Sequence, residues 1–451
     1  MHSAGFAFWA STAIFVIAYA IIVSEKIHKT KVALFGAALV LILKILTQEE
    51  GLHNMEFGVD WNVIFLLISM MIIINIMQKT GVFQYMAVKS AKAGKGEPFT
   101  IMVILAVVTA VTSAFLDNVT TVLLIAPVTL VIARELEVDA VPFLVTEVMA
   151  SNIGGTATLI GDPPNIMIAS KAGLNFMDFI YHVSPAVIIM MVVWLIVWRI
   201  VFKKRLVVSE ERKLRIMAMD ESTLITNPAL LKKSGIVLGF TILGFVLHGF
   251  FHYEPATVAL MGATTLLLIS REDPHEILTH VEWVTIAFFV GLFIIIGGTV
   301  KSGLIEALSV KMIALTNPHP DSMFTLAMVM VWFSAISSAI VDNIPFVATM
   351  NPLIIDMAHK VFAPAAGAHI SEGIQHATLM PVWWALSLGA CLGGNGTAIG
   401  ASANVIVVGM AEKAGTPISF VRFLKYGIPT MFLTVAVSTV YIAVRYYVLK
   451  I

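Results

Sequence analysis

Charged residues are scarce in this sequence, and their scarcity excludes a large class of proteins. Only 12% of the 451 residues are Asp, Glu, Lys or Arg, whereas 59% are hydrophobic. Soluble domains carry about 25% charged and roughly 45–50% apolar residues, so a water-soluble enzyme of this size is excluded. The 28 basic and 28 acidic residues balance, so net charge gives no attraction to nucleic acid, and no nucleic-acid partner is predicted.

Cysteine is nearly absent as well. Cys391 stands alone, which excludes an internal disulfide, a zinc ribbon, an iron–sulfur cluster or a three-thiol metalloid cage, because each needs several thiolates. The 12 histidines are scattered, and no metal site is predicted. Gly94-Lys95 lacks the flanking residues of a nucleotide-binding P-loop. No cofactor is therefore expected. A proton or sodium gradient would supply the energy for transport, and ATP could be used only through a separate ATPase subunit. Whether the chain forms a homodimer stays open.

Long apolar runs are what the sequence has in abundance. A helix needs about 17–25 mainly apolar residues to cross a bilayer, and eight plain runs approach or reach that length. They cover residues 5–24, 31–47, 61–77, 179–202, 234–251, 255–270, 283–300 and 423–444. Four further stretches are apolar but interrupted: 99–131, 141–170, 324–355 and 380–412. The sequence therefore predicts an all-α polytopic membrane protein embedded in the lipid bilayer.

The loops between these runs predict how the chain crosses the bilayer. If 99–131 and 324–355 are re-entrant hairpins and the other interrupted stretches cross, each half of the chain crosses five times. Placing the N-terminus outside then leaves most Lys and Arg in cytoplasmic loops, as the positive-inside rule requires. We therefore expect a multi-pass inner (plasma) membrane protein with both termini outside, and a solvated cytoplasmic linker at 203–233.

An internal repeat divides the chain into two copies, expected at 1–202 and 234–451. DWNVIFLLISMMIIINIMQKTG from Asp60 matches EWVTIAFFVGLFIIIGGTVKSG from Glu282. SAFLDNVTTVLLIAP then matches SAIVDNIPFVATMNP, and GGTATLIGDPPN matches GGNGTAIGASAN, in the same order. Because each copy crosses an odd number of times, the second copy must lie in the membrane with the opposite orientation to the first.

Glycine and proline interrupt one crossing of each copy. Glycine is costly in a helix interior, and proline removes a donor and clashes with the preceding turn, so 141–170 and 380–412 should unwind in the middle. Unwound backbone at membrane depth survives only where it is buried in protein or lines a wet cavity, as at the repeat interface of many secondary transporters. We expect two inverted repeats of five spans each, every repeat with a re-entrant helical hairpin and a discontinuous helix.

Short amide and hydroxyl side chains gather at the hairpin tips and in the unwound segments. They offer donors and acceptors that suit a small oxygen-rich solute, or oxygen ligands that suit Na+. The predicted substrate-binding residues are Asn118, Thr120, Thr121, Asn152, Thr156, Thr158, Asn165, Asn343, Asn395, Thr397, Ser402 and Asn404.

Four acidic residues lie within the apolar stretches and are predicted to couple transport to a proton or ion. An ionisable residue inside a span costs at least about 2.5–3.5 kcal/mol and is a functional candidate by default. Asp117 and Asp342 are the first candidates because both copies carry them. Glu147 is the second, and Asp162 could instead cap a half-helix. Capping of the second hairpin helix is an open alternative for Asp117 and Asp342.

At these motifs the sequence resembles the ArsB/NhaD branch of the ion transporter superfamily, the citrate-transporter-like permeases. LDNVTTVLLIAP, SNIGGTATLIGDPPN and LGACLGGNGTAIGASANV look most like its P-protein type, over essentially the whole chain. The resemblance implies ion- or proton-coupled transport, commonly arsenite or antimonite efflux in bacteria. It also matches Asn118, Thr120 and Asn343 to positions that hold ion and substrate in related dicarboxylate carriers. Those carriers have Ser-Asn-Thr at the tips, and the acids found here make a dicarboxylate less favourable.

Several functions remain as alternatives. The first is proton-coupled efflux of arsenite or antimonite, a small inorganic solute exchanged for a coupling ion. The second is Na+/H+ antiport, and an organic-anion carrier of the same superfamily is a third. An intramembrane aspartyl hydrolase is disfavoured, because Leu159 stands where its Gly-x-Gly-Asp motif needs the first glycine. A passive channel would show no coupling. The chain is therefore not expected to be an enzyme.

Overall fold

The computed structural model describes residues 2–24, 26–54, 56–203, 206, 208–362 and 373–451. Within these ranges the regular structure is helical, apart from one β-bridge between His319 and Ser322. The first eleven helices are α1 His2–Ser24, α2 Lys29–Ile42, α3 Gln48–His53, α4 Trp61–Gln78, α5 Val82–Ala93, α6 Pro98–Phe115, α7 Asn118–Glu135, α8 Val141–Gly155, α9 Pro163–Ala172, α10 Phe176–His182 and α11 Ser184–Phe202. The later helices are α12 Glu210–Met217, α13 Pro228–Phe251, α14 Pro255–Ser270, α15 Pro274–Thr279, α16 Trp283–Lys301, α17 Leu304–Thr316, α18 Phe324–Ile340, α19 Asn343–Val361, α21 Met380–Gly393, α22 Ser402–Lys413 and α23 Phe420–Ile442.

The helices have the length and surface of a membrane protein. Among the described residues, 8 helices are long and apolar enough to cross a bilayer, and α14 and α18 are apolar but shorter. Large apolar side chains point away from the protein on the outer helices: Trp9 on α1 is 71% exposed and Phe250 on α13 is 81% exposed. Contiguous apolar surface of this kind is unfavourable in water. The expectation of a multi-span, all-helical membrane protein is confirmed.

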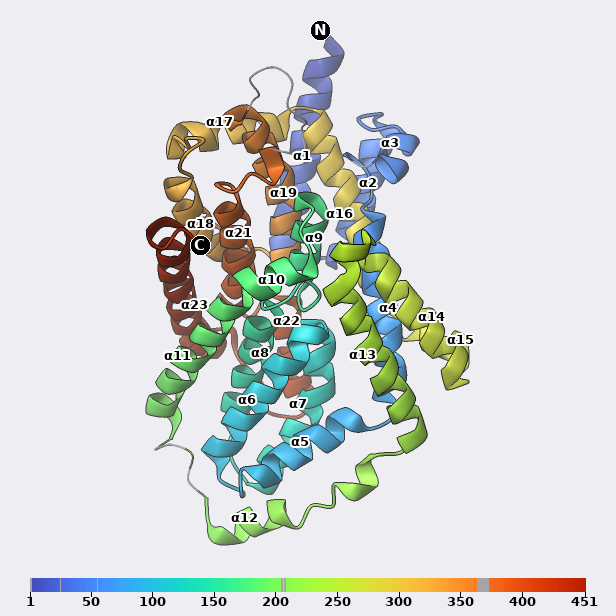
Figure 1. Cartoon of the computed structure of the whole chain (residues 1–451), viewed down its shortest axis with the longest axis vertical. Coiled ribbons are helices and arrows are strands. Elements are labelled where there is room, and N and C mark those ends of the chain that lie inside the picture. Colours follow the sequence, from blue (N-terminus) through green and yellow to red (C-terminus); the bar gives the residue numbers. More distant parts are fainter. Residues whose placement is uncertain (1, 25, 55, 204–205, 207, 363–372) are drawn as a thin grey trace.

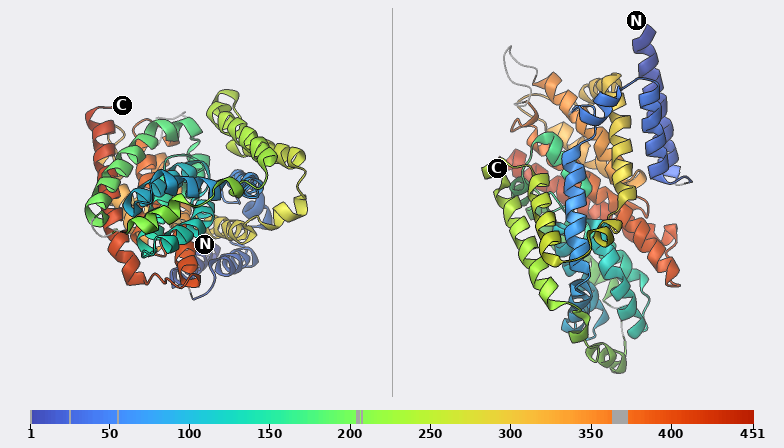
Figure 2. Two further views of the ribbon diagram at one scale, coloured as in Figure 1. Left: turned by 90° about the horizontal axis from the view of Figure 1, so that it is seen from below. Right: turned by 90° about the vertical axis from the view of Figure 1, so that its right-hand side faces the viewer.

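The same packing partners recur in the two halves of the chain. α6 packs along α8 as α18 packs along α21, and α7 meets α22 as α19 meets α9. The halves also interlock, because α4 packs mainly against α14 whereas α16 packs mainly against α2. In Figure 1, α5, α6 and α7 occupy the lower part of the molecule and α17, α18 and α19 the upper part, with α8 and α22 near the centre; Figure 2 shows α1 at one side.

Two helical hairpins coincide with the first pair of interrupted stretches. Two residues join α6 to α7 and α18 to α19, and an aspartate ends each connection. The Asp117 carboxylate accepts from the Thr120 N–H (2.9 Å), and the Asp342 carboxylate accepts from the Ile344 N–H (3.1 Å). Both acids therefore occupy the N-cap positions that the capping alternative anticipated.

The second pair of interrupted stretches is broken where glycine and proline accumulate. α8 ends at Gly155 and α9 begins at Pro163, while α21 ends at Gly393 and α22 begins at Ser402. Close helix contact also requires glycine here. A Cβ on Gly154 would lie 2.1 Å from the Ala110 carbonyl oxygen, and one on Gly393 would lie 2.4 Å from that of Ala335.

Alanine at Gly154 is expected to destabilise the fold by about 1–3 kcal/mol, the usual cost of overpacking, because α6 and α8 must move apart. The melting temperature of the detergent-solubilised protein, followed by size-exclusion chromatography after heating, measures the effect. Gly239→Ala in α13 is the matched control, since a Cβ there meets nothing within 4 Å. Equal melting temperatures for the two variants would contradict the close contact.

Two expected segments differ from the structure in extent. α2 ends at Ile42, before the end of the run 31–47, because the chain turns at Lys44, whose φ is 55°. The run 179–202 is divided at Val183 between α10 and α11. Residues 204, 205 and 207 of the expected linker lie outside the described ranges.

The linker helix α12 is held against the first half by ion pairs. Arg215 and Arg212 on α12 pair with Glu137, and their hydrogen bonds and charge hold the pKa of that carboxyl below its ordinary value. Lys213 pairs with Glu97 at 2.5 Å. These ion pairs attach α12 to the ends of the first hairpin, while the charged side chains of α12 remain exposed or half-buried.

Candidate functional site

The centre of the molecule is a cluster of buried amides contributed by both halves. Asn152 on α8 donates through Nδ2 to Asn395 Oδ1 (3.0 Å) and to Asn404 Oδ1 (3.0 Å). Asn118, at the first hairpin tip, donates to Asn152 Oδ1 (3.3 Å). All four side chains are at most 4% exposed. We call Asn118, Asn152, Asn395 and Asn404 the amide cluster.

Two asparagines hold the unwound segments in place. Asn165 donates to the carbonyl oxygens of Thr156 (3.0 Å) and Thr158 (2.9 Å). Asn404 donates in the same way to those of Gly394 (2.7 Å) and Thr397 (2.8 Å). The side chains thus satisfy carbonyls that the broken helices leave without an intrahelical partner. Both asparagines therefore stabilise the conformation of the unwound segments, in addition to any ligand that they bind.

The threonine hydroxyls are mostly engaged within the protein. Thr158 donates to the Ala114 carbonyl and Thr397 to the Ala339 carbonyl, linking each unwound segment to the adjacent hairpin. Thr156 donates to the Asn152 carbonyl (2.7 Å), and Thr120 donates to Asp117 (2.5 Å). Of the predicted threonines, Thr121 alone has a buried hydroxyl that finds no partner among the described residues.

One amide donor in the cluster is also left over. Asn395 uses its Oδ1 to accept from Asn152, but its buried Nδ2 finds no partner among the described residues. A buried donor without a partner costs about 1–3 kcal/mol, so this N–H2 group is available to a polar ligand.

Asp162 is fully buried between the halves. It stands at the N-cap position of α9 but accepts no capping bond from that helix. Its carboxylate instead faces Asn343 Nδ2, at 3.3 and 3.5 Å, across the repeat interface. It also lies within electrostatic range of Asp117 and Asp342. The expected half-helix capping role of Asp162 is therefore wrong.

Glu147 lies deeper in the first half, on α8. It is 2% exposed, and neither carboxylate oxygen has a hydrogen-bond partner among the described residues. Thr129 on α7 faces it. An unpaired carboxylate in such an environment is strongly disfavoured unless it is protonated or binds a cation.

Asp342 has a partner that sequence reasoning did not identify. Lys29 Nζ lies 2.6 Å from Asp342 Oδ2 and 2.7 Å from Ser402 Oγ. Ser402 also donates to Asp342 Oδ2 (2.9 Å). No local pattern could reveal this pair, because the two charges are separated by 313 residues.

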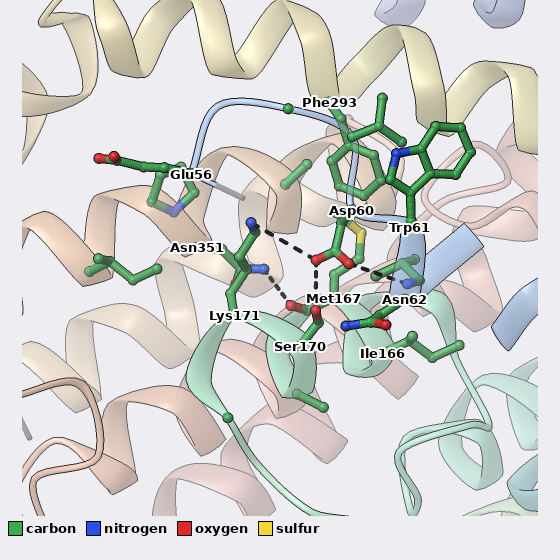
Figure 3. Close-up of a pocket in the computed structure, with 18 of the residues that line it drawn as sticks. Glu56, Asp60, Trp61, Asn62, Ile166, Met167, Ser170, Lys171, Phe293 and Asn351 are labelled. Carbon is green, nitrogen blue, oxygen red and sulfur yellow. Dashed lines mark hydrogen bonds and ion pairs between the residues drawn. The ribbon is translucent and has the colours of Figure 1, made fainter. Parts of the chain in front are cut away.

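A cavity of about 1150 Å³ opens beside the unwound segment of the first half (Figure 3). Its walls come from α4, α16 and the α13–α14 turn on one side, and from α9 and α19 on the other. Asp60 lines the cavity. Its Oδ2 accepts a hydrogen bond from Ser170 Oγ (2.6 Å) and lies 3.9 Å from Lys171 Nζ. Ile166, next to Asn165, lines it too. The cavity thus approaches the segment that Asn165 holds.

Comparison with known proteins adds a consistent result. A family model described as a citrate transporter matches residues 19–389. An uncharacterized transporter of Mycobacterium tuberculosis is 44% identical, covering 97% of this chain and 98% of that protein. The P protein of Homo sapiens is 33% identical over 97% of this chain and 60% of that protein. The Alcanivorax borkumensis YdaH transporter, described as having an unusual topology, shares the fold: 98% of each chain aligns at 12% identity with a TM-score of 0.54.

Proposed function

Because this chain belongs to the citrate transporter family, it is a membrane transporter rather than an enzyme, and we propose that it is a secondary active carrier of the ArsB type. Its solute would be small, oxygen-bearing and uncharged, with arsenite or antimonite as the best candidates. Export would be driven by inward movement of protons.

We further propose that the two halves are inverted repeats of five spans each, with α6–α7 and α18–α19 as re-entrant hairpins. The recurring pairs α6–α8 and α18–α21 support this, as do α7–α22 and α19–α9. The matched loop contacts of Asn165 and Asn404 support it as well. In this arrangement both termini lie outside the plasma membrane, which fusions of an alkaline phosphatase reporter to each terminus would test.

The amide cluster with its free Asn395 donor is the observation that carries the solute assignment. Arsenite near neutral pH is an uncharged trihydroxide, so amides can hydrogen-bond it as they would a small polyol. Asp162 lies within electrostatic range of Asp117 and Asp342, and Lys29 offsets the charge of Asp342. Ionised Asp117 and Asp162 would repel a citrate-like anion.

Flux into proteoliposomes tests the proposal. An imposed gradient that is acidic outside should drive arsenite out of right-side-out vesicles, and reversing the gradient should reverse net movement. The control is empty liposomes with the same gradient. Arsenite movement that is unchanged by gradients of both signs would refute proton-coupled export.

Na+/H+ antiport is the second candidate, favoured by one specific observation. Neither carboxylate oxygen of Glu147 has a hydrogen-bond partner among the described residues, and Asp162 faces Asn343 and Cys391, with no cationic side chain as a partner in the same part of the structure. Buried carboxylates of this kind can bind Na+ and H+ alternately. Currents on solid-supported membranes evoked by sodium jumps, but not by arsenite, would favour this function over metalloid export.

A further inference from the structure

Lys29 adds a charged link between two groups of helices that also meet where α16 packs against α19. α2, which begins at Lys29, packs mainly against α16 and α1. Asp342 and Ser402 belong to α19 and α22, which pack mainly against α9 and α7. The Lys29–Asp342 pair therefore joins the unit of α1, α2 and α16 to the unit that carries the unwound segments.

Lys29 does not stabilise the helix on which it lies. It is the first residue of α2, where the helix dipole disfavours a cation by about 0.3–1 kcal/mol. Its neighbours Lys26 and Lys31 point to the exterior, whereas the Lys29 side chain is 28% exposed and its ammonium lies 5.0 Å from the centre of the buried Phe288 ring. The ammonium is thus held by a carboxylate, a hydroxyl and an aromatic face.

Those ligands are the kind that would hold a free monovalent cation. Asp342 Oδ2 and Ser402 Oγ are hard oxygen donors, and the Asp342 side chain is only 10% exposed. A single position beside Asp342 Oδ2 cannot hold both the ammonium and another cation, because the two would repel each other at contact distance.

We propose that Lys29 is a tethered cation that occupies an inorganic monovalent cation site at Asp342 and Ser402, so that binding of a free cation there displaces Lys29 and releases the two helix units from each other. This rests on the proposed carrier function and adds to it a contact between the helix units that responds to a monovalent cation. Release alters the cavity of Figure 3, because α16 of the first unit and α19 of the second both line it.

A cysteine reporter in the cavity tests this without any solute. Val300 on α16 lines the cavity, and maleimide labelling of Val300→Cys in the purified full chain is followed while Na+ replaces choline at constant ionic strength. The parent chain is the blank, since its one cysteine is buried. Because Lys29→Met has no ammonium for Na+ to displace, it should label in choline at the rate that the wild type reaches in saturating Na+, and added Na+ should change that rate no further. Lys29→Arg should keep the Na+ concentration for the half-maximal change in labelling near the wild-type value, and Asp342→Asn should abolish the response.

Tyr19→Phe separates displacement from simple loss of contact. Tyr19 on α1 donates to the Pro345 carbonyl of α19 (2.7 Å), so it joins the same two units without a charge. It should leave the Na+ midpoint unchanged. A Lys29→Met variant that still responds to Na+ as the wild type does, or wild-type labelling that never responds to Na+, overturns the inference. Loss of the response in Lys29→Met, in a chain that moves no arsenite, supports the inference and refutes metalloid export alone.

Discussion

Leucine at Asn152 is expected to reduce solute flux by at least about 30-fold. The substitution removes three hydrogen bonds and leaves the Asn395 and Asn404 carbonyl oxygens without their donor. Two orphaned buried acceptors cost about 2–6 kcal/mol together, and the lower figure already corresponds to about 30-fold in an equilibrium constant. Since both acceptors belong to the second half, the change weakens the arrangement in which the halves meet. Initial rates of arsenite flux into proteoliposomes measure it.

Two further variants separate transport from folding. Gln78→Leu also replaces an amide, but at the exposed end of α4, and should keep wild-type flux. Asn395→Ala removes the free Nδ2 donor, while Asn152 keeps its bond to Asn404. The variant also leaves one N–H of Asn152 without its acceptor, so its melting temperature should fall less than that of Asn152→Leu, while its KM rises. Wild-type flux in both Asn152→Leu and Asn395→Ala would remove the amide cluster from the transport site.

Asparagine at Asp162 is expected to abolish accumulation of solute against its gradient. A difference of one pH unit supplies about 1.4 kcal/mol, so a carrier exchanging one proton per solute sustains an accumulation ratio of about tenfold. Asp162→Asn preserves side-chain size beside Asn343 but cannot change charge, and the ratio should fall to about one. Exchange of labelled for unlabelled arsenite without a pH gradient should persist. Steady-state arsenite content in vesicles with an imposed gradient measures the ratio.

Two comparisons sharpen this result. Asp321→Asn makes the same replacement at a side chain that is 89% exposed, and should leave the accumulation ratio unchanged. Glu147→Gln tests the other buried carboxyl in parallel. If Asp162→Asn still accumulates solute while Glu147→Gln does not, the proton is carried by Glu147 and the assignment to Asp162 is wrong.

The places where helices stop were readable from the sequence because local residues cause them. Gly155 and Pro163 bound the first gap, and Gly393 bounds the second with a glycine-rich turn behind it. The aspartates at the hairpin tips were readable for the same reason, since an N-cap depends on the three residues that follow it. These features need no knowledge of distant parts of the chain.

The partners of the charged side chains could not be read in the same way. Lys29 pairs with Asp342 only because the fold brings these distant residues together. The bond between Asp60 and Ser170 likewise depends on how α4 meets α9. Thr158 and Thr397 suggested ligands by composition, yet their hydroxyls bind hairpin carbonyls. Tertiary packing decides which polar groups remain available.

An electron cryo-microscopy map of the full chain in lipid nanodiscs, recorded with and without antimonite, tests the central claim most directly. The account predicts added density for antimony beside Asn395, between α8 and α21 that end at Gly155 and Gly393. Continuous, lipid-facing helices through 141–170 and 380–412, with no density between them in either map, would contradict it.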